Sequence, residues 1–223
     1  MRRIPQELLR RMADDLPAED RNEMAIPSYL HPNPALRWMA WRRVEVIAEH
    51  LAVAARRGST ETAIMDFGCG SGVLLDECRK RADHVYGVDL VLRSARTLVD
   101  EWQLDRVTLL TPDEASEKVA PHSVDVILAA EVLEHVEPLG PALERFRAWL
   151  KPGGKLLVSL PTENALYQLG RRIAGFSGHY HHSNARSIDA EITASGFRRE
   201  RLEKIPLGGP FSIYWVIDYG LHA

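Results

Sequence analysis

Short apolar runs alternate with helical stretches along most of this chain. Apolar runs rich in β-forming residues lie at 63–68, 84–90, 107–110, 124–130 and 155–161. Stretches with helical spacing lie between them, at 73–82, 93–103 and 141–150. Strands that alternate with helices in this way pair in parallel through right-handed crossovers. The pattern therefore predicts a doubly wound α/β domain.

The end of the chain has a different pattern. A helical stretch over 185–195 is followed by two strand-like runs, 198–205 and 211–219. The five residues 206–210 between these runs are too few for a helical crossover, so the last strands are expected to pair antiparallel. We therefore expect a Rossmann-like, seven-stranded, mostly parallel sheet with an antiparallel last strand.

The chain before the first strand is helical. Apolar residues recur at helical spacing within 35–57, and charged residues such as Arg43 are expected on the other faces of this helix. We expect residues 1–58 to form an N-terminal helical cap and residues 59–223 to form the α/β domain. The cap either packs on the domain with its polar side in water or also covers a ligand site. In the same way, Trp38 and Trp41 either pack internally or wall an apolar pocket.

Composition and charge narrow the class of protein. Of the 223 residues 45% are hydrophobic and 26% charged, with a formal net charge of −3, so no overall attraction to polyanions is expected. Cys69 and Cys78 cannot build a disulfide framework. The sequence has neither a membrane-spanning apolar run nor a secretory signal at its start. We expect a soluble, cytoplasmic protein without nucleic-acid partners or membrane insertion; the sequence predicts no oligomeric state.

A glycine-rich turn links the first strand to the helix after it. Gly68, Gly70 and Gly72 allow a tight turn and a close approach of a ligand to the backbone. Asp89 ends the next strand, where a carboxylate can accept hydrogen bonds from ribose hydroxyls. The dinucleotide fingerprint would need a glycine in place of Val73. A NAD(P)-dependent oxidoreductase is therefore the less favoured hypothesis for this nucleoside site.

The chain resembles the small-molecule (type 11/12-like) class I S-adenosylmethionine-dependent methyltransferases. The resemblance rests on the spacing Asp66-x-Gly68-x-Gly70-x-Gly72, on Asp89 and on the segments 124–136 and 150–159. The resemblance implies methyl transfer to a small-molecule acceptor, most readily to an oxygen, by a class I methyltransferase domain over 59–223. It implies cofactor contacts from Asp66, Gly68, Cys69, Gly70, Gly72, Asp89, Leu90, Asp113 and Glu131. Asp113 would contact adenine or, alternatively, cap a helix.

The segment 131–136 follows the fourth strand and is expected beside the transferable methyl group. On a helix, Glu131, Glu134 and His135 would share one face. Three interpretations remain open. The segment is a shared scaffold with Glu131 lining the cofactor pocket, or His135 is a general base, or the three side chains hold Mg²⁺ or Mn²⁺, as in the ubiquinone-pathway and small-RNA methyltransferases that the segment resembles. S-adenosylmethionine is thus the expected cofactor, and a divalent metal such as Mg²⁺ is not favoured.

A histidine-rich loop follows the fifth strand at the same edge of the sheet. Its residues His179, His181 and His182 match no zinc pattern and are either solvated or part of an acceptor site. The candidate catalytic residues are His135, Glu131 and His181. Because intact cofactor residues do not establish an acceptor site, a catalytically silent S-adenosylmethionine-binding regulatory protein is the remaining alternative.

Overall fold

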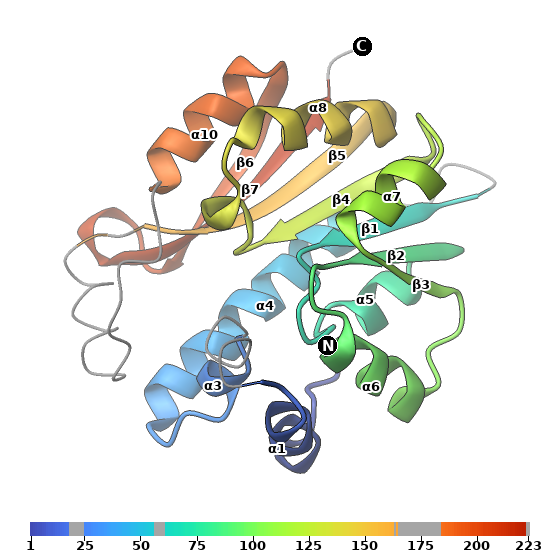
Figure 1. Cartoon of the computed structure of the whole chain (residues 1–223). Helices are drawn as coiled ribbons and strands as arrows, with labels where there is room; N and C mark the ends of the chain where they lie inside the picture. The colour runs from blue at the N-terminus through green and yellow to red at the C-terminus, as the bar shows by residue number, and fades with distance from the viewer. Residues whose placement is uncertain (18–24, 56–60, 163, 165–183, 222–223) are drawn as a thin grey trace.

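A single mixed sheet organises the protein, whose computed structural model describes residues 1–17, 25–55, 61–162, 164 and 184–221. The strand order is β3-β2-β1-β4-β5-β7-β6 (Figure 1). Only β7 runs against its neighbours, pairing antiparallel with both β5 and β6. The seven-stranded sheet and the antiparallel last strand are therefore confirmed. The strands are β1 (Ala63–Phe67), β2 (His84–Val88), β3 (Val107–Leu110), β4 (Val124–Ala130), β5 (Leu150–Pro161), β6 (Phe197–Pro206) and β7 (Ser212–Leu221).

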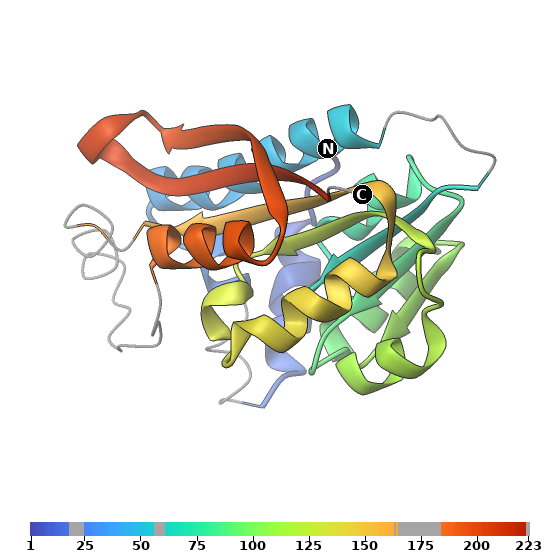
Figure 2. The same cartoon turned by 90° about the horizontal axis from the view of Figure 1, so that it is seen from above.

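Helices cover both faces of this sheet, and each face has its own hydrophobic core. Figure 2 shows α4 on one side and α8 and α10 on the other. One face carries α4 (Pro34–Ala54), α5 (Leu75–Arg79) and α6 (Arg93–Trp102). The other carries α7 (Pro112–Lys118), α8 (Leu139–Trp149) and α10 (Ala185–Ala194). The strand β4 is buried along most of its length, as expected for a central parallel strand between two helical layers.

In the described ranges, the N-terminal helices are α1 (Gln6–Asp14), α3 (Ile26–Tyr29) and α4, which pack on the same face of the sheet. Helix α4 begins at Pro34, where Asn33 accepts a hydrogen bond from the Ala35 N–H, a favourable N-terminal cap. Leu9 and Ile47 belong to the same core as Val126 of the sheet. The predicted cap of residues 1–58 thus shares a hydrophobic core with the α/β part of the chain, and its standing as a separate domain stays a prediction.

The regular elements differ in a few places from the sequence pattern. The helix predicted over 73–82 is regular only at Leu75–Arg79. The fifth strand begins at Leu150, ahead of the predicted 155, because the Pro-Gly-Gly segment continues the strand through an irregular register. In the part of the chain that the structure describes, no helix is long and apolar enough to cross a membrane.

Candidate cofactor and acceptor site

The glycine-rich turn lies at the carboxyl end of β1. The Gly68 and Cys69 N–H groups donate to the Val88 carbonyl at 2.7 and 3.1 Å, which ties the turn to the end of β2. Gly68 has φ +76°, and a Cβ there would lie 2.5 Å from the Val132 side chain. Gly72 has φ +78°, and a Cβ would meet Leu75 at 2.9 Å. Both positions therefore favour glycine for their conformation, and Gly68 requires it for space as well.

Asp89 closes the site on the side of β2. Its Oδ2 accepts a hydrogen bond from the Gly70 N–H at 2.7 Å, and its Oδ1 accepts one from the Val91 N–H at 3.0 Å. Each carboxylate oxygen has more than one acceptor direction, so ribose hydroxyls can still bind. The next residue, Leu90, is an apolar side chain that is 82% exposed. An exposed apolar surface beside a fixed carboxylate suits the adenosine part of a nucleoside ligand.

Asp66 lies in β1, directly before the turn, and is buried. Burial, assisted by the negative charge of Asp89, raises the pKa of its carboxyl group to about 7. A cationic group bound nearby would favour the ionised form and lower this pKa again. A bound ammonium group could therefore pair with the Asp66 carboxylate once it is ionised.

Asp113 lies in the first turn of α7, directly after β3 at the same edge of the sheet. The cap of this helix is Thr111: its hydroxyl accepts from the Glu114 N–H at 3.3 Å, and the Glu114 carboxylate accepts from the Thr111 N–H at 2.9 Å. The alternative prediction that Asp113 caps this helix is therefore wrong. Its side chain is exposed, so an adenine contact stays a prediction.

The segment after β4 does not form the expected helix face. Only Leu133–His135 is helical, as a single 3₁₀ turn. Glu131 lies outside it with φ +53°, which turns the chain away from a helical path. Glu134 is buried and His135 is exposed, so the shared face predicted for the three residues is wrong. Across the described ranges, no group of three or more His, Cys, Asp or Glu side chains is placed to hold a metal ion.

Glu131 instead faces a buried arginine of the N-terminal helices. Arg43 of α4 pairs with its Oε2 at 2.5 Å, and the Ser159 hydroxyl donates to its Oε1 at 3.3 Å. Arg43 also donates to the Tyr214 hydroxyl of β7 at 3.2 Å. Its ring neighbours are Tyr214 and Tyr29, with Cζ 5.2 and 5.9 Å from the two ring centroids. These residues form the Arg43 cluster: Arg43, Glu131, Ser159, Tyr214 and Tyr29.

The electrostatics of the Arg43 cluster are governed by burial. Burial raises the pKa of the Glu131 carboxyl, while the charge of Arg43 and the Ser159 hydrogen bond oppose this shift. Burial also raises the pKa of Tyr214 to about 12, and that of Tyr29 above its usual value. Both phenol groups therefore remain protonated at neutral pH.

Sequence reasoning missed Arg43 and Tyr214. The spacing predicted that Arg43 lies on the polar side of its helix. This prediction is wrong, because Arg43 is 7% exposed and lies on the buried side of α4. One signal was available, because Ala40, Arg43 and Ile47 follow the spacing of a single helix face. An arginine at such a position on an apolar face indicates a buried polar partner.

The surroundings of the two cysteines and the two tryptophans bear on the roles considered for them. Burial raises the pKa of the Cys69 and Cys78 thiols well above the usual value, so neither supplies a thiolate nucleophile. Trp41 is buried and stacks at a tilt on Tyr29, with ring centroids 4.6 Å apart. Trp38 is 51% exposed beside a shallow hollow of the N-terminal helices. The histidines at 179–182, with His181 among them, lie outside the described residues.

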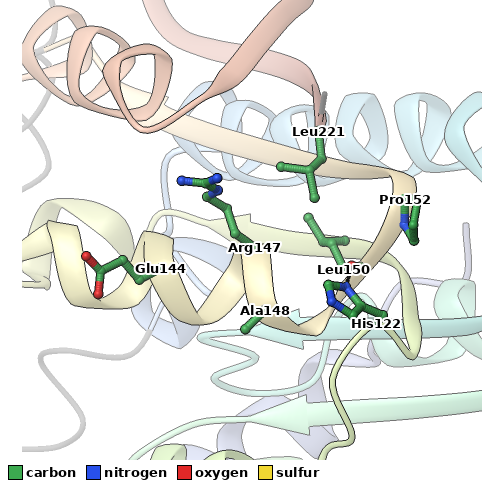
Figure 3. A pocket seen from close by; sticks show the side chains of 7 residues that line it. All are labelled: His122, Glu144, Arg147, Ala148, Leu150, Pro152 and Leu221. Carbon is green, nitrogen blue, oxygen red and sulfur yellow. Dashed lines mark hydrogen bonds between the residues drawn. The ribbon is translucent and has the colours of Figure 1, made fainter. Parts of the chain in front are cut away.

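A separate hollow of about 400 Å³ lies at the other end of the strands. Figure 3 shows the side chains around it: His122, Glu144, Arg147, Ala148, Leu150, Pro152 and Leu221. His122 precedes β4 and Leu150 begins β5, so this hollow is at the amino ends of these strands. Ligands of open α/β sheets bind at the carboxyl ends. The candidate site is therefore the opposite edge, which holds the glycine turn, Asp89 and the Arg43 cluster.

The order of the strands, with β7 antiparallel and the glycine turn bonded to Asp89, gives the chain the architecture of a class I S-adenosylmethionine-dependent methyltransferase. A family model described as a methyltransferase domain matches residues 37–202. The match covers more than half of the chain, and the chain belongs to this methyltransferase family.

Relatives and solved structures agree with this class. The ubiquinone biosynthesis O-methyltransferase of Stutzerimonas stutzeri is 30% identical over 125 residues, which are 55% of this chain and 51% of that protein. The enzyme of the same description from Paracidovorax citrulli is 28% identical over 159 residues, 66% of this chain and 65% of that protein. The chain thus spans about half to two thirds of these curated relatives. The structure of the N-methyltransferase NodS from Bradyrhizobium japonicum with S-adenosylhomocysteine shares the fold, with a TM-score of 0.63 and 17% identity over 97% of each chain.

Proposed function

We propose that this protein transfers the methyl group of S-adenosylmethionine to a hydroxyl oxygen of a small-molecule acceptor. The observation that carries the proposal is the hydrogen bond from the Gly70 N–H to Asp89, which fixes a ribose-binding carboxylate against the glycine turn. The similarity to ubiquinone biosynthesis O-methyltransferases supports oxygen as the accepting atom. We further propose a cytoplasmic location and no nucleic-acid partner, in line with the net charge of −3.

The cofactor lies along the carboxyl ends of β1, β2 and β3 in this proposal. The backbone of Gly68–Gly72, including Cys69, supports the methionine part, and Asp66 holds its ammonium group. Asp89 takes the ribose hydroxyls. Leu90 and Asp113 face the adenine, and Glu131 approaches from the end of β4. The exposed apolar side chain of Leu90 and the raised pKa of Asp66 support this arrangement.

Methyl transfer is an in-line displacement. The bond from the sulfonium sulfur to the methyl carbon breaks as the bond from the acceptor oxygen forms, and the hydroxyl proton leaves to a base. The sulfonium becomes the neutral thioether S-adenosylhomocysteine. Alignment of the two reactants supplies most of the rate enhancement in such a step. A positioned base adds about 10²–10⁴-fold.

The exposed His135 is the base we propose, because Glu131 already has donors on both of its carboxylate oxygens. A carboxylate held by Arg43 and Ser159 suits an orienting role better than proton abstraction. His181 stays a second candidate from the sequence. Replacing His135 by Gln is expected to lower turnover about 10²-fold or more while the affinity for S-adenosylhomocysteine stays unchanged.

The first experiment is isothermal titration calorimetry of the protein with S-adenosylhomocysteine, and with NAD(H) and NADP(H) in parallel. Binding of S-adenosylhomocysteine alone supports the proposed cofactor; binding of a nicotinamide dinucleotide alone would contradict it. A panel of phenols and catechols with S-adenosylmethionine, with and without Mg²⁺, then tests the acceptor by mass spectrometry of the methylated product. Cofactor binding without turnover across acceptor classes would favour a silent regulatory protein.

A further inference from the structure

We propose that Arg43 is a positioning residue for methyl transfer, which fixes the carboxylate of Glu131 beside the cofactor turn from the N-terminal helix α4. The inference rests on the proposed function, because it assigns a role to Arg43 at that same site. It makes the N-terminal helices part of the working site and gives them more than a covering role.

Glu131 stands directly beside the proposed cofactor. Its chain neighbour Val132 packs against the glycine turn so closely that a Cβ on Gly68 would lie 2.5 Å from it. Glu131 itself has φ +53°, a backbone conformation that non-glycine residues rarely adopt. Such strain persists only where the surrounding contacts determine it, and it concentrates at functional sites. The orientation of this side chain is therefore imposed by its partners.

Arg43 is the main charged partner and is itself held from several elements. Its guanidinium contacts the Glu131 carboxylate, donates to the Tyr214 hydroxyl of β7, and lies near the rings of Tyr29 and Tyr214. With Arg43 only 7% exposed, little water competes for these donors. A shift of α4 relative to the sheet would therefore move the Glu131 carboxylate.

Fold stability alone does not account for such a pair. A buried ion pair commonly stabilises a protein no more than a packed apolar pair of the same volume, because both charges lose their hydration. What the pair does supply is a fixed direction for a charged carboxylate. This is the property that a site for a cationic methyl donor requires.

The charged and titratable groups around Glu131 predict a specific pH signature. They are Arg43 from α4, Tyr214 from β7 and Tyr29 from α3, with the carboxyl groups of Glu134 and Asp66 close to Tyr214 and Tyr29, respectively. The neutral Ser159 from β5 donates to the Glu131 carboxylate. Arg43 is the group in this set that is charged positively. When Arg43 is replaced by a neutral residue, no cation opposes the effect of burial on the Glu131 carboxyl. The pKa of Glu131 therefore rises further, and the carboxyl stays protonated up to a higher pH.

The test measures S-adenosylhomocysteine affinity by calorimetry as a function of pH for Arg43→Met, Glu131→Gln and the double variant. Arg43→Met is expected to lower the affinity about tenfold or more and to add a pH transition that the wild type lacks. The double variant should lose that added transition, and its loss of affinity should be smaller than the product of the two single losses. Arg43→Lys should restore part of the affinity.

The matched control is Arg42→Met, because Arg42 is the next residue of α4 and pairs with Glu49 at 2.7 Å on the outer side of the helix. It should leave both affinity and pH profile unchanged. Thermal unfolding of each variant reports whether it is folded; if Arg43→Met does not fold, Arg43→Gln, which also removes the positive charge, carries the same measurement. Two results would overturn the role of Arg43. One is a loss of affinity in the double variant equal to the product of the two single losses. The other is an affinity of Arg43→Met that changes with pH in the same way as that of the wild type. Failure of the wild type to bind S-adenosylhomocysteine would instead overturn the proposed function, and the role of Arg43 with it.

Discussion

The Gly70 N–H donates a hydrogen bond of 2.7 Å to the Asp89 carboxylate, which joins the turn after β1 to the end of β2. The bond fixes the distance between the two parts of the chain that would hold the methionine and ribose moieties of the cofactor. It also leaves acceptor directions of the carboxylate available to a ligand.

Replacing Asp89 by Ala should weaken S-adenosylhomocysteine binding at least about tenfold, the cost of losing hydrogen bonds to a charged group. Calorimetry measures the affinity. The matched control is Asp83→Ala, since Asp83 precedes β2 at its amino end and accepts from the Thr62 N–H at 3.0 Å. Equal affinities for Asp89→Ala and wild type would remove Asp89 from the cofactor site.

Asp66 should make both stability and cofactor binding depend on pH. Burial and the charge of Asp89 raise the pKa of Asp66 to about 7 in the folded chain. The unfolded chain releases this proton near pH 4, so the contribution of Asp66 makes the folded state less stable as the pH rises from about 4 to about 7. Asp66→Asn removes this loss and should therefore raise the free energy of unfolding at about pH 8 relative to wild type.

Urea unfolding at about pH 5 and about pH 8 tests this stability difference. The same variant should bind S-adenosylhomocysteine more weakly than wild type, and the wild-type affinity should increase as the pH rises through about 7, where Asp66 ionises. Parallel pH dependences of stability in variant and wild type would contradict the raised pKa.

A methyl group at Gly68 should damage the site directly. Gly68→Ala combines φ +76° with a Cβ only 2.5 Å from Val132, so it should cost about 1–3 kcal/mol of stability and reduce cofactor affinity. Gly140→Ala is the matched control, because nothing lies within 4 Å of the added Cβ and the residue is in α8. Urea unfolding and calorimetry compare the two; similar behaviour of both variants would show that the turn is adaptable.

His50 should stabilise the packing of α4 on the sheet without touching the cofactor. It is fully buried, with Nδ1 2.5 Å from Asp218 and Nε2 3.1 Å from Glu203. Burial disfavours the charge, but the hydrogen bonds to Asp218 and Glu203 outweigh it and raise the pKa of His50. Its stabilising contribution is therefore complete below about pH 6.5 and is lost as the pH rises through the raised value.

His50→Gln should lower the free energy of unfolding by about 3 kcal/mol at pH near 6 and by less at pH near 9, with S-adenosylhomocysteine affinity preserved. Urea unfolding at both pH values provides the measurement. As an internal comparison, Asp218→Asn should lower the free energy of unfolding more than Glu203→Gln does. The reason is that the Asp218 side chain is 11% exposed, whereas that of Glu203 is 33% exposed. An equal loss at both pH values would mean that His50 is neutral in the folded chain.

The sequence by itself determined the order of the elements, the antiparallel pairing of the last strands and the position of the glycine-rich turn. These features are local: period-two and helical spacings, glycines that permit φ > 0, and a connection too short for a crossover. The tertiary structure alone decided which distant side chains meet, as His50 and Asp218 do across 168 positions and Arg43 of α4 and Glu131, just after β4, also do. No local pattern encodes such contacts, because they depend on how a helix packs on a sheet. For the same reason, the helix predicted around Glu131 is not found. Glu131 instead adopts a left-handed backbone conformation, and its carboxylate pairs with Arg43.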